Sequence, residues 1–286
     1  MKNKFIWACL LGIVSGVASA TPPLNSANTI HPFYVDVQVG NIQSCDPIVP
    51  NACRQIDDFH TRTDAMSMAY DGQFLYLGLQ NPSYQYGTIQ KCDPAGTNNC
   101  VQIDDFHTRG GAKSLASDGQ YLYAGIGNGT IQKCDPRGVN NCNQIDDFHT
   151  RGGAVSLASD GQYLYAAIGN GTIQKCGINN VNNCVQIDDF HAQNNVVGLA
   201  SDGQYLYAST GNGSIQKCDP AGTNNCVQID NFPMQKDSHP MDIAFNGQYL
   251  YVANLYYGTI ERCDPRGVNN CTQIEKFNTW LYSLGA

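Results

Sequence analysis

The chain has 286 residues, of which 14% are charged, and its formal net charge is −8. Its lysines and arginines are few and scattered, so it lacks both the basic patch of a nucleic-acid-binding protein and the polybasic cluster that holds a protein on anionic lipid. We therefore expect no nucleic-acid partner.

The first twenty residues have the pattern of a secretory signal peptide. Lys2 and Lys4 precede an apolar run from Phe5 to Val17, and an Ala-x-Ala cleavage site ends at Ala20. The run is too short to span a bilayer. We therefore expect cleavage near Ala20, a lead segment over residues 21–32 and no membrane insertion. The product would be a secreted monomer, extracellular or periplasmic.

Beyond the lead segment the chain repeats itself. An isoleucine precedes the first cysteine of each repeat, and the steps between these isoleucines are 47, 42, 42, 42 and 45 residues (Ile42, Ile89, Ile131, Ile173, Ile215 and Ile260). A period in the low forties is typical of a four-stranded propeller blade. No stretch has the period of an amphipathic helix.

One repeat contains four predicted strands, at Lys113–Ser117, Tyr121–Gly125, Thr130–Cys134 and Asn143–Phe148. Asp118-Gly119 predicts a tight hairpin turn between the first two strands. Residues rich in Asp, Pro, Gly and Asn predict the loop between the third and fourth strands. In a propeller the first strand lines the crowded axis, where its small residues fit.

The cysteines predict one disulfide in each repeat, with the first cysteine at the end of the third strand and the second at the start of the fourth. Cys9 leaves with the signal peptide, and the remaining twelve cysteines form pairs with seven residues between partners. Zinc sites favour closer cysteines and usually histidine nearby, so we expect no metal and no cofactor here. The predicted pairs are Cys45 with Cys53, Cys92 with Cys100, Cys134 with Cys142, Cys176 with Cys184, Cys218 with Cys226 and Cys263 with Cys271.

The two ends of the chain predict the blade count. Phe33–Val39, Asn41–Cys45 and Arg54–Phe59 match the second, third and fourth strands of the repeat, whereas Tyr282–Ala286 matches a first strand. Five complete blades and these fragments predict an all-β, six-bladed propeller domain over residues 33–286. Its last blade combines three N-terminal strands with one C-terminal strand, which removes open sheet edges.

One stretch carries a family resemblance. The segment from His239 to Cys263 contains Pro-Met-Asp-Ile-Ala-Phe-Asn and Leu-Tyr-Val-Ala-Asn. It resembles the repeat of NHL-type and YWTD-type propellers, although Asn254 replaces their Asp and the cysteine pairs are an addition. The resemblance implies a six-bladed ring. Such families contain protein-binding scaffolds, and related folds host hydrolases and lyases, so the resemblance does not select a function.

Two repeated motifs resemble metal sites. Asp-Asp-Phe-His recurs at the end of the outermost strands, with the histidine directly after the strand, but ligands of one zinc must lie about 4 Å apart, and separate blades would hold these histidines farther apart (His60, His107, His149 and His191). Asp-Pro-x-Gly-x-Asn-Asn in the cysteine loops resembles a calcium loop, but the copies at Cys45 and Cys176 lack parts of it. Turn chemistry explains the motif better.

Candidate site residues lie where the repeat becomes irregular. In propeller topology, the hairpins between second and third strands and the connections between blades share one face. We expect aromatic and charged side chains to gather there: Tyr84, Tyr86, Lys236, Asp237, His239, Asp242, Tyr256, Tyr257, Trp280 and Tyr282. Exposed aromatic residues beside charges are typical of binding hot spots and sugar platforms.

Three functions remain open. Our first hypothesis is an exported, non-enzymatic binding module that recognises a protein or a glycan through this face. An alternative is a hydrolase or lyase using Asp237, His239 and Asp242 at the channel mouth, although near-identical blades argue against the asymmetric constellation that catalysis needs. A third is a multivalent lectin with equivalent pockets between blades. We assign no catalytic residue.

Overall fold

A computed structural model describes residues 31–37, 41–58, 64–80, 87–106, 111–127, 129–147, 154–169, 171–179, 183–189, 195–231, 240–254, 257–277 and 281–286. The secondary structure of this part consists of β-strands and turns. Among these residues no helix has the length and apolarity needed to cross a membrane. The predicted signal peptide and most of the lead segment lie outside the described residues.

The strands form six antiparallel sheets of four, which we number as blades 1 to 6. From innermost to outermost, blade 1 contains β24 (Leu281–Gly285), β1 (Phe33–Val37), β2 (Asn41–Cys45) and β3 (Cys53–Asp58), and blade 2 contains β4 (Asp64–Tyr70), β5 (Leu75–Gln80), β6 (Gly87–Cys92) and β7 (Val101–Phe106). In the same order, blade 3 contains β8 (Ala112–Ser117), β9 (Leu122–Ile126), β10 (Thr130–Cys134) and β11 (Asn143–Asp147), and blade 4 contains β12 (Ala154–Ser159), β13 (Tyr163–Ile168), β14 (Thr172–Gly177) and β15 (Val185–Asp189). Blade 5 contains β16 (Val196–Ser201), β17 (Leu206–Thr210), β18 (Ser214–Cys218) and β19 (Val227–Asn231), and blade 6 contains β20 (Pro240–Phe245), β21 (Leu250–Asn254), β22 (Thr259–Cys263) and β23 (Thr272–Lys276).

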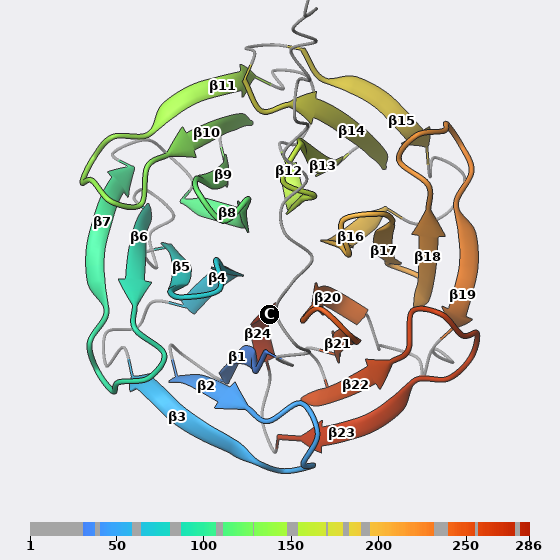
Figure 1. Cartoon of the computed structure of the whole chain (residues 1–286), viewed down its shortest axis with the longest axis horizontal. Helices are drawn as coiled ribbons and strands as arrows, with labels where there is room; N and C mark the ends of the chain where they lie inside the picture. The colour runs from blue at the N-terminus through green and yellow to red at the C-terminus, as the bar shows by residue number, and fades with distance from the viewer. Residues whose placement is uncertain are drawn as a thin grey trace, which may run out of the picture.

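The sheets stand around a central axis as a six-bladed β-propeller (Figure 1). Neighbouring inner strands contact one another around the whole ring, including β20 with β24 and β24 with β4. Blade 1 joins the two ends of the chain, because β24 pairs with β1 in the register Tyr34↔Gly285 and Val35↔Leu284. The predicted fold, blade count and shared blade are confirmed.

The hydrophobic core lies between blades. Each of six buried clusters combines side chains of two adjacent sheets; one joins Tyr76 and Ile89 of blade 2 to Leu115, Leu122 and Ile126 of blade 3. The second strands are therefore buried on both faces along most of their length, as in β9 and β13. Sheet-on-sheet packing of this kind makes each blade depend on its neighbours.

The turn between the first and second strands is built by an aspartate. Asp118 Oδ1 accepts hydrogen bonds from the backbone N–H groups of Gln120 and Tyr121, and Oδ2 accepts one of 2.7 Å from the buried Tyr123 hydroxyl. The central residues are Gly119, with φ of 85°, and Gln120, one position later than predicted. Asp118 instead occupies the first position, where its side chain can reach the later N–H groups.

All six predicted disulfides are present, and each closes the loop between the third and fourth strands of its own blade. The bonded pairs, from blade 1 to blade 6, are Cys45 with Cys53, Cys92 with Cys100, Cys134 with Cys142, Cys176 with Cys184, Cys218 with Cys226 and Cys263 with Cys271. The prediction of one bridge in each repeat is therefore confirmed.

The position of the second cysteine differs slightly from the expectation. In blade 1 it begins the fourth strand, because Cys53 pairs with Cys45 in the ladder between β2 and β3. In blades 2 to 6 the second cysteine instead lies directly before the fourth strand, at Cys100, Cys142, Cys184, Cys226 and Cys271. In blade 3, for example, the ladder between β10 and β11 begins with Lys133 and Asn143, so the bridge lies just beyond its last backbone pair.

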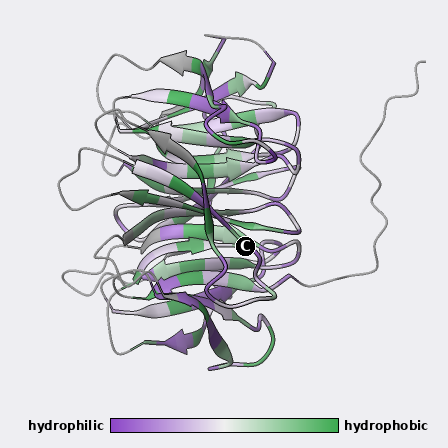
Figure 2. Cartoon of the chain, turned by 90° about the vertical axis from the view of Figure 1, so that its left-hand side faces the viewer, coloured by the Kyte–Doolittle hydropathy of each residue, from purple (hydrophilic) through white to green (hydrophobic). Residues whose placement is uncertain are grey.

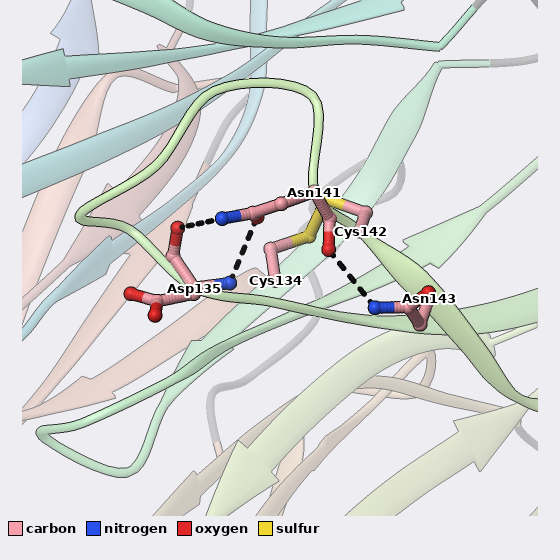
Figure 3. The surroundings of a disulfide bond; sticks show 5 residues. All are labelled: Cys134, Asp135, Asn141, Cys142 and Asn143. Atoms are coloured by element: carbon pink, nitrogen blue, oxygen red, sulfur yellow. Dashed lines mark hydrogen bonds between the residues drawn. A yellow bond between two sulfur atoms is a disulfide. The ribbon is translucent and has the colours of Figure 1, made fainter.

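The disulfide loop is also held by an asparagine. Figure 3 shows the bridge between Cys134 and Cys142. Asn141 crosses the loop, accepting from Asp135 N and donating to Asp135 O at 3.0 and 2.9 Å. The disulfide and the asparagine therefore hold this exposed loop in one conformation.

A basic side chain of each blade reaches the disulfide loop of the next. Lys133 Nζ lies 3.9 Å from the ring centroid of Tyr121 and donates to the carbonyl of Ile178. Equivalent bonds to a proline carbonyl are donated by Lys91 to Pro136, by Lys175 to Pro220, by Lys217 to Pro265 and by Arg262 to Pro47. We call these contacts the straps. Arg54 supplies the sixth, and together they bridge all six blade interfaces.

The disulfide loops also bind the preceding blade. Asn140 has a positive φ of 52°, and its N–H donates to the carbonyl of Ile103 on β7 at 2.9 Å. Asn98, Asn224 and Asn269 do the same to Ile56, Ile187 and Ile229. Asparagine tolerates the left-handed conformation better than most residues. Each such loop is thus held to the preceding blade by two contacts, one from a basic side chain of that blade and one from its own backbone.

Candidate functional site

Seen from the side, the ring has two faces (Figure 2). Because the strands are antiparallel, the first hairpin and the disulfide loop of each blade share one face, which we call the staple face. The hairpins between second and third strands and the connections between blades share the opposite face, the loop face. Inner strands begin at the loop face and end at the staple face.

The structure describes three of the ten predicted site residues, namely Asp242, Tyr257 and Tyr282. Tyr257 lies in the hairpin between β21 and β22 on the loop face and is 40% exposed. Asp242 and Tyr282 lie on the inner strands β20 and β24 and line the central channel. The other predicted residues lie outside the described part: Tyr84, Tyr86, Lys236, Asp237, His239, Tyr256 and Trp280.

The central channel holds a cavity of about 190 Å³ lined by the inner strands of all six blades. Each inner strand has an irregularity in its pairing near the loop face; β8, for example, pairs Ala112 with Ile126 and Ser114 with Gly125, so Lys113 is passed over. Such bulges re-aim a side chain and are common beside binding sites. We call the bulge residues that line the cavity the mouth ring: Met66, Lys113, Val155, Val197 and Tyr282.

In five blades the side chain of the residue after the bulge bonds across a blade interface, whereas blade 5 has Gly198 at this position. Ser67 Oγ donates to the carbonyl of Ala112 at 3.2 Å, and Ser156 Oγ accepts from the Leu199 N–H at 2.9 Å. Blade 6 has Asp242 at this position. Its Oδ2 accepts from the Leu284 N–H at 2.8 Å, and its Oδ1 accepts from the Ile243 N–H at 3.0 Å. A carboxylate thus stands where blades 1 to 4 use a serine hydroxyl.

Burial governs the charge of Asp242. Removal from water raises the pKa of this carboxyl to about 7, against which the N–H donors of Leu284 and Ile243 act only partly. The side chain is not fully covered and lies on the cavity wall. Asp242 is therefore an ionisable group that titrates near neutral pH within the channel.

Of the predicted catalytic residues Asp237, His239 and Asp242, the described part of the chain includes only Asp242. The enzyme hypothesis remains a prediction that rests on sequence for two of its three residues. Asp242 alone supplies a candidate acid–base group, and a general acid or base needs a reacting group within hydrogen-bonding reach.

The sequence reasoning missed Lys113 as a site residue. Lys113 lies in the mouth ring and is exposed, and no described residue accepts a hydrogen bond from it. The available signal was a difference between repeats: Ala-Lys-Ser-Leu-Ala-Ser at 112–117 becomes Ala-Val-Ser-Leu-Ala-Ser at 154–159. Because these two repeats are otherwise nearly identical, the change from Lys113 to Val155 marks a position at which blades 3 and 4 differ in charge.

The aspartate carboxylates of the disulfide loops are bonded within their own loops. Asp135 Oδ1 accepts from the Arg137 N–H, its carboxylate pairs with the Arg137 guanidinium at 2.8 Å, and this arginine lowers the pKa of Asp135 to about 2. Asp93 Oδ1 likewise accepts from the Ala95 N–H.

In the described part of the chain, one group of possible metal ligands comprises Asp57, Cys92 and Cys100, but these cysteines form a disulfide and offer no thiolate.

The staple face carries five aromatic rings at equivalent positions, and a basic side chain lies over each: Phe74, Tyr121, Tyr163, Tyr205 and Tyr249. A sugar platform presents an open aromatic face to its ligand. A cation of the same blade already lies over one face of each of these rings, so that face is not open to a ligand.

No family model matches the chain, and no curated protein matches its sequence. The fold does have counterparts among solved structures. A chain of the nidogen/laminin complex has a TM-score of 0.71 with 14% identity, covering 89% of this chain and 97% of that one. The computationally designed Ika8 protein has a TM-score of 0.51 with 14% identity, covering 88% of this chain and 73% of that one. At this identity the similarity shows the fold alone.

Proposed function

We propose that this protein is an exported, non-enzymatic interaction module that binds a protein partner through its loop face. Export is supported by the predicted signal peptide and by the six disulfides, which form and persist in oxidising compartments. Such a compartment leaves open the choice between periplasm and extracellular space.

The observation that carries the proposal is the unequal use of the two faces. On the staple face, lysines, asparagines and aspartates of successive blades repeat the same bonds within the fold. At the loop face the mouth ring combines Met66, Lys113, Tyr282 and two valines, and Tyr257 exposes an aromatic ring. Repetition suits a scaffold, whereas recognition of one partner needs a surface that differs around the ring.

A protein partner is favoured over a glycan for two reasons. The solved propeller with the TM-score of 0.71 comes from a complex between two proteins. In addition, the five repeated aromatic rings that could have formed equal sugar platforms are covered by cations. The same coverage disfavours a lectin with equivalent sites around the ring.

The test begins with arrays of purified secreted proteins and of glycans, probed with the mature chain. Calorimetry on a hit then compares wild type with Tyr257→Ala and Trp280→Ala, and Arg137→Ala on the staple face serves as the control. We expect a protein hit and a loss of about thirtyfold in affinity for each aromatic variant, which is the usual cost of a hot-spot aromatic. A glycan hit with several equal sites, or loss of binding in Arg137→Ala alone, would overturn the proposal.

A further inference from the structure

The central channel contains two opposed charges that the fold does not require. Among the side chains that line the cavity, Lys113 is the one basic residue and Asp242 the one acidic residue within the described part of the chain. Lys113 lies on β8 of blade 3 and Asp242 on β20 of blade 6. These strands are three blades apart in the ring and face each other across the axis (Figure 1).

The structural role of Asp242 does not need a carboxylate. In blade 4, Ser156 accepts a hydrogen bond from the N–H of Leu199 across the next interface. Asp242 accepts the equivalent bond from Leu284. A serine could accept this bond between blades 6 and 1, so the charge of Asp242 remains to be explained.

Both charged groups belong to residues that line the cavity, and both have unused bonding capacity. Each carboxylate oxygen of Asp242 accepts one backbone N–H in the structure, and an oxygen of this type can accept two hydrogen bonds. The ammonium group of Lys113 has three donors, and no described residue accepts from them. Nothing cationic among the described residues offsets the buried charge of Asp242, whose raised pKa results from desolvation.

We propose that the mouth of the channel binds a small zwitterion, with Lys113 facing the carboxylate of the ligand and Asp242 facing its primary ammonium group. Each ligand charge would then meet a protein charge in a partly desolvated cavity, where charge-assisted hydrogen bonds are strong. Amino acids and dipeptides belong to this chemical class.

The remaining walls suit such a ligand. Met66, Val155 and Val197 supply apolar contacts between the two charged poles. Tyr282 lies in blade 1, next to the blade of Asp242, so its ring can contact an ammonium group bound at that carboxylate. A cavity of about 190 Å³ is smaller than the sites of drug-sized ligands, which occupy roughly 300–1,000 Å³. Small zwitterions match this size.

The site does not depend on the proposed protein partner, so it can be tested with the mature chain alone. The probes are glycine, 4-aminobutyrate, 6-aminohexanoate and glycylglycine, each measured by calorimetry at about pH 8 up to about 10 mM. Hexanoate and hexylamine, which each carry one of the two charges, are the matched control ligands. We expect at least one zwitterion to bind at least about tenfold more tightly than either control ligand.

Three variants each remove one of the two charges. Lys113→Met copies the residue of blade 2, Asp242→Ser copies the hydroxyl of blade 4, and Asp242→Asn keeps the shape without the charge. Each should weaken zwitterion binding by about tenfold or more while the unliganded protein stays folded. Arg137→Ala on the staple face should bind as wild type does.

The pH dependence provides a separate readout. Protonation of Asp242 below its pKa of about 7 removes the acceptor charge, so affinity should fall between about pH 8 and pH 6 in wild type and stay level in Asp242→Asn. Equal binding of hexylamine and 6-aminohexanoate would overturn the proposal. So would unchanged affinity in Asp242→Ser and Lys113→Met, or failure of every zwitterion to bind at about 10 mM.

Discussion

Arg54 donates a hydrogen bond of 2.9 Å to the carbonyl of Pro94, and this bond replaces a lysine that blade 1 lacks. In blades 2 to 5 the residue before the first cysteine is a lysine, whereas blade 1 has Ser44 there. Arg54 is the cross-strand partner of Ser44 on β3. A basic group is thus supplied from the adjacent strand, and the strap between blades 1 and 2 is retained.

Removing a strap should weaken one blade interface. Lys133→Met deletes both the hydrogen bond to Ile178 and the contact over Tyr121, so we expect a loss of about 1–2 kcal/mol in unfolding free energy. Chemical denaturation measures this loss. Lys133→Arg is the matched control, because Arg262 fills the same role in blade 6, and it should retain most of the stability. Equal destabilisation by both variants would contradict a specific strap.

Opening one disulfide should destabilise the domain without unfolding it. Replacing Cys134 and Cys142 with Ser releases a short loop, and loop-closure entropy assigns about 2–3 kcal/mol to such a bridge. Asn141 still bonds Asp135 across the same loop, so the fold should persist. Denaturation of the variant measures the cost, and peptide mapping without reductant should find the other five bridges within their own repeats. A bridge between repeats would contradict the structure.

Deleting Leu281–Ala286 should prevent the ring from closing. The deletion removes β24, exposes the edge of β1, and removes the hydrogen bond that Ser283 donates to Ala65 of blade 2. An unpaired edge invites association between chains. We expect aggregation or poor folding, measured by light scattering and circular dichroism. A monomer with an unchanged melting temperature would show that blade 1 does not need its inner strand.

Acid should stabilise the fold through Asp242. Its pKa is about 7 in the folded protein against an ordinary value of 3.8, so between these values the folded state keeps a proton that the unfolded state loses. Stability from this group is therefore greatest below about pH 4, falls as the pH rises to about 7, and is level above that. Each pKa unit corresponds to about 1.4 kcal/mol, so the effect is at most about 4 kcal/mol.

The measurement is the difference in unfolding free energy between wild type and Asp242→Asn at several pH values. Subtraction removes the contributions of Glu261 and Glu275, whose pKa values burial also raises. The difference should change steadily between about pH 4 and 7. A difference that is independent of pH would show that Asp242 keeps its ordinary pKa in the folded chain.

Sequence reasoning predicted the architecture because the repeat carries it in local signals. Spacing of Cys134 and Cys142 gave the disulfide, and the match of Tyr282–Ala286 to a first strand gave the closure. The strap of Arg54 was not predictable in this way, because it depends on the register between β2 and β3. Lys113 was missed for a related reason: its place in the mouth ring follows from a bulge, which the sequence does not mark.

The closure of blade 1 also implies that the chain could begin at any blade of the ring. β24 ends and β1 begins where every other blade has a hairpin turn, since Gly285 pairs with Tyr34 as Ala116 pairs with Tyr123. A short Asp-Gly linker from Ala286 to His31 would complete that turn, and cutting the chain at Gly119 instead would create new termini at the staple face. Circular permutants of this kind should fold to the same ring, because each blade would keep all its strands and both neighbours.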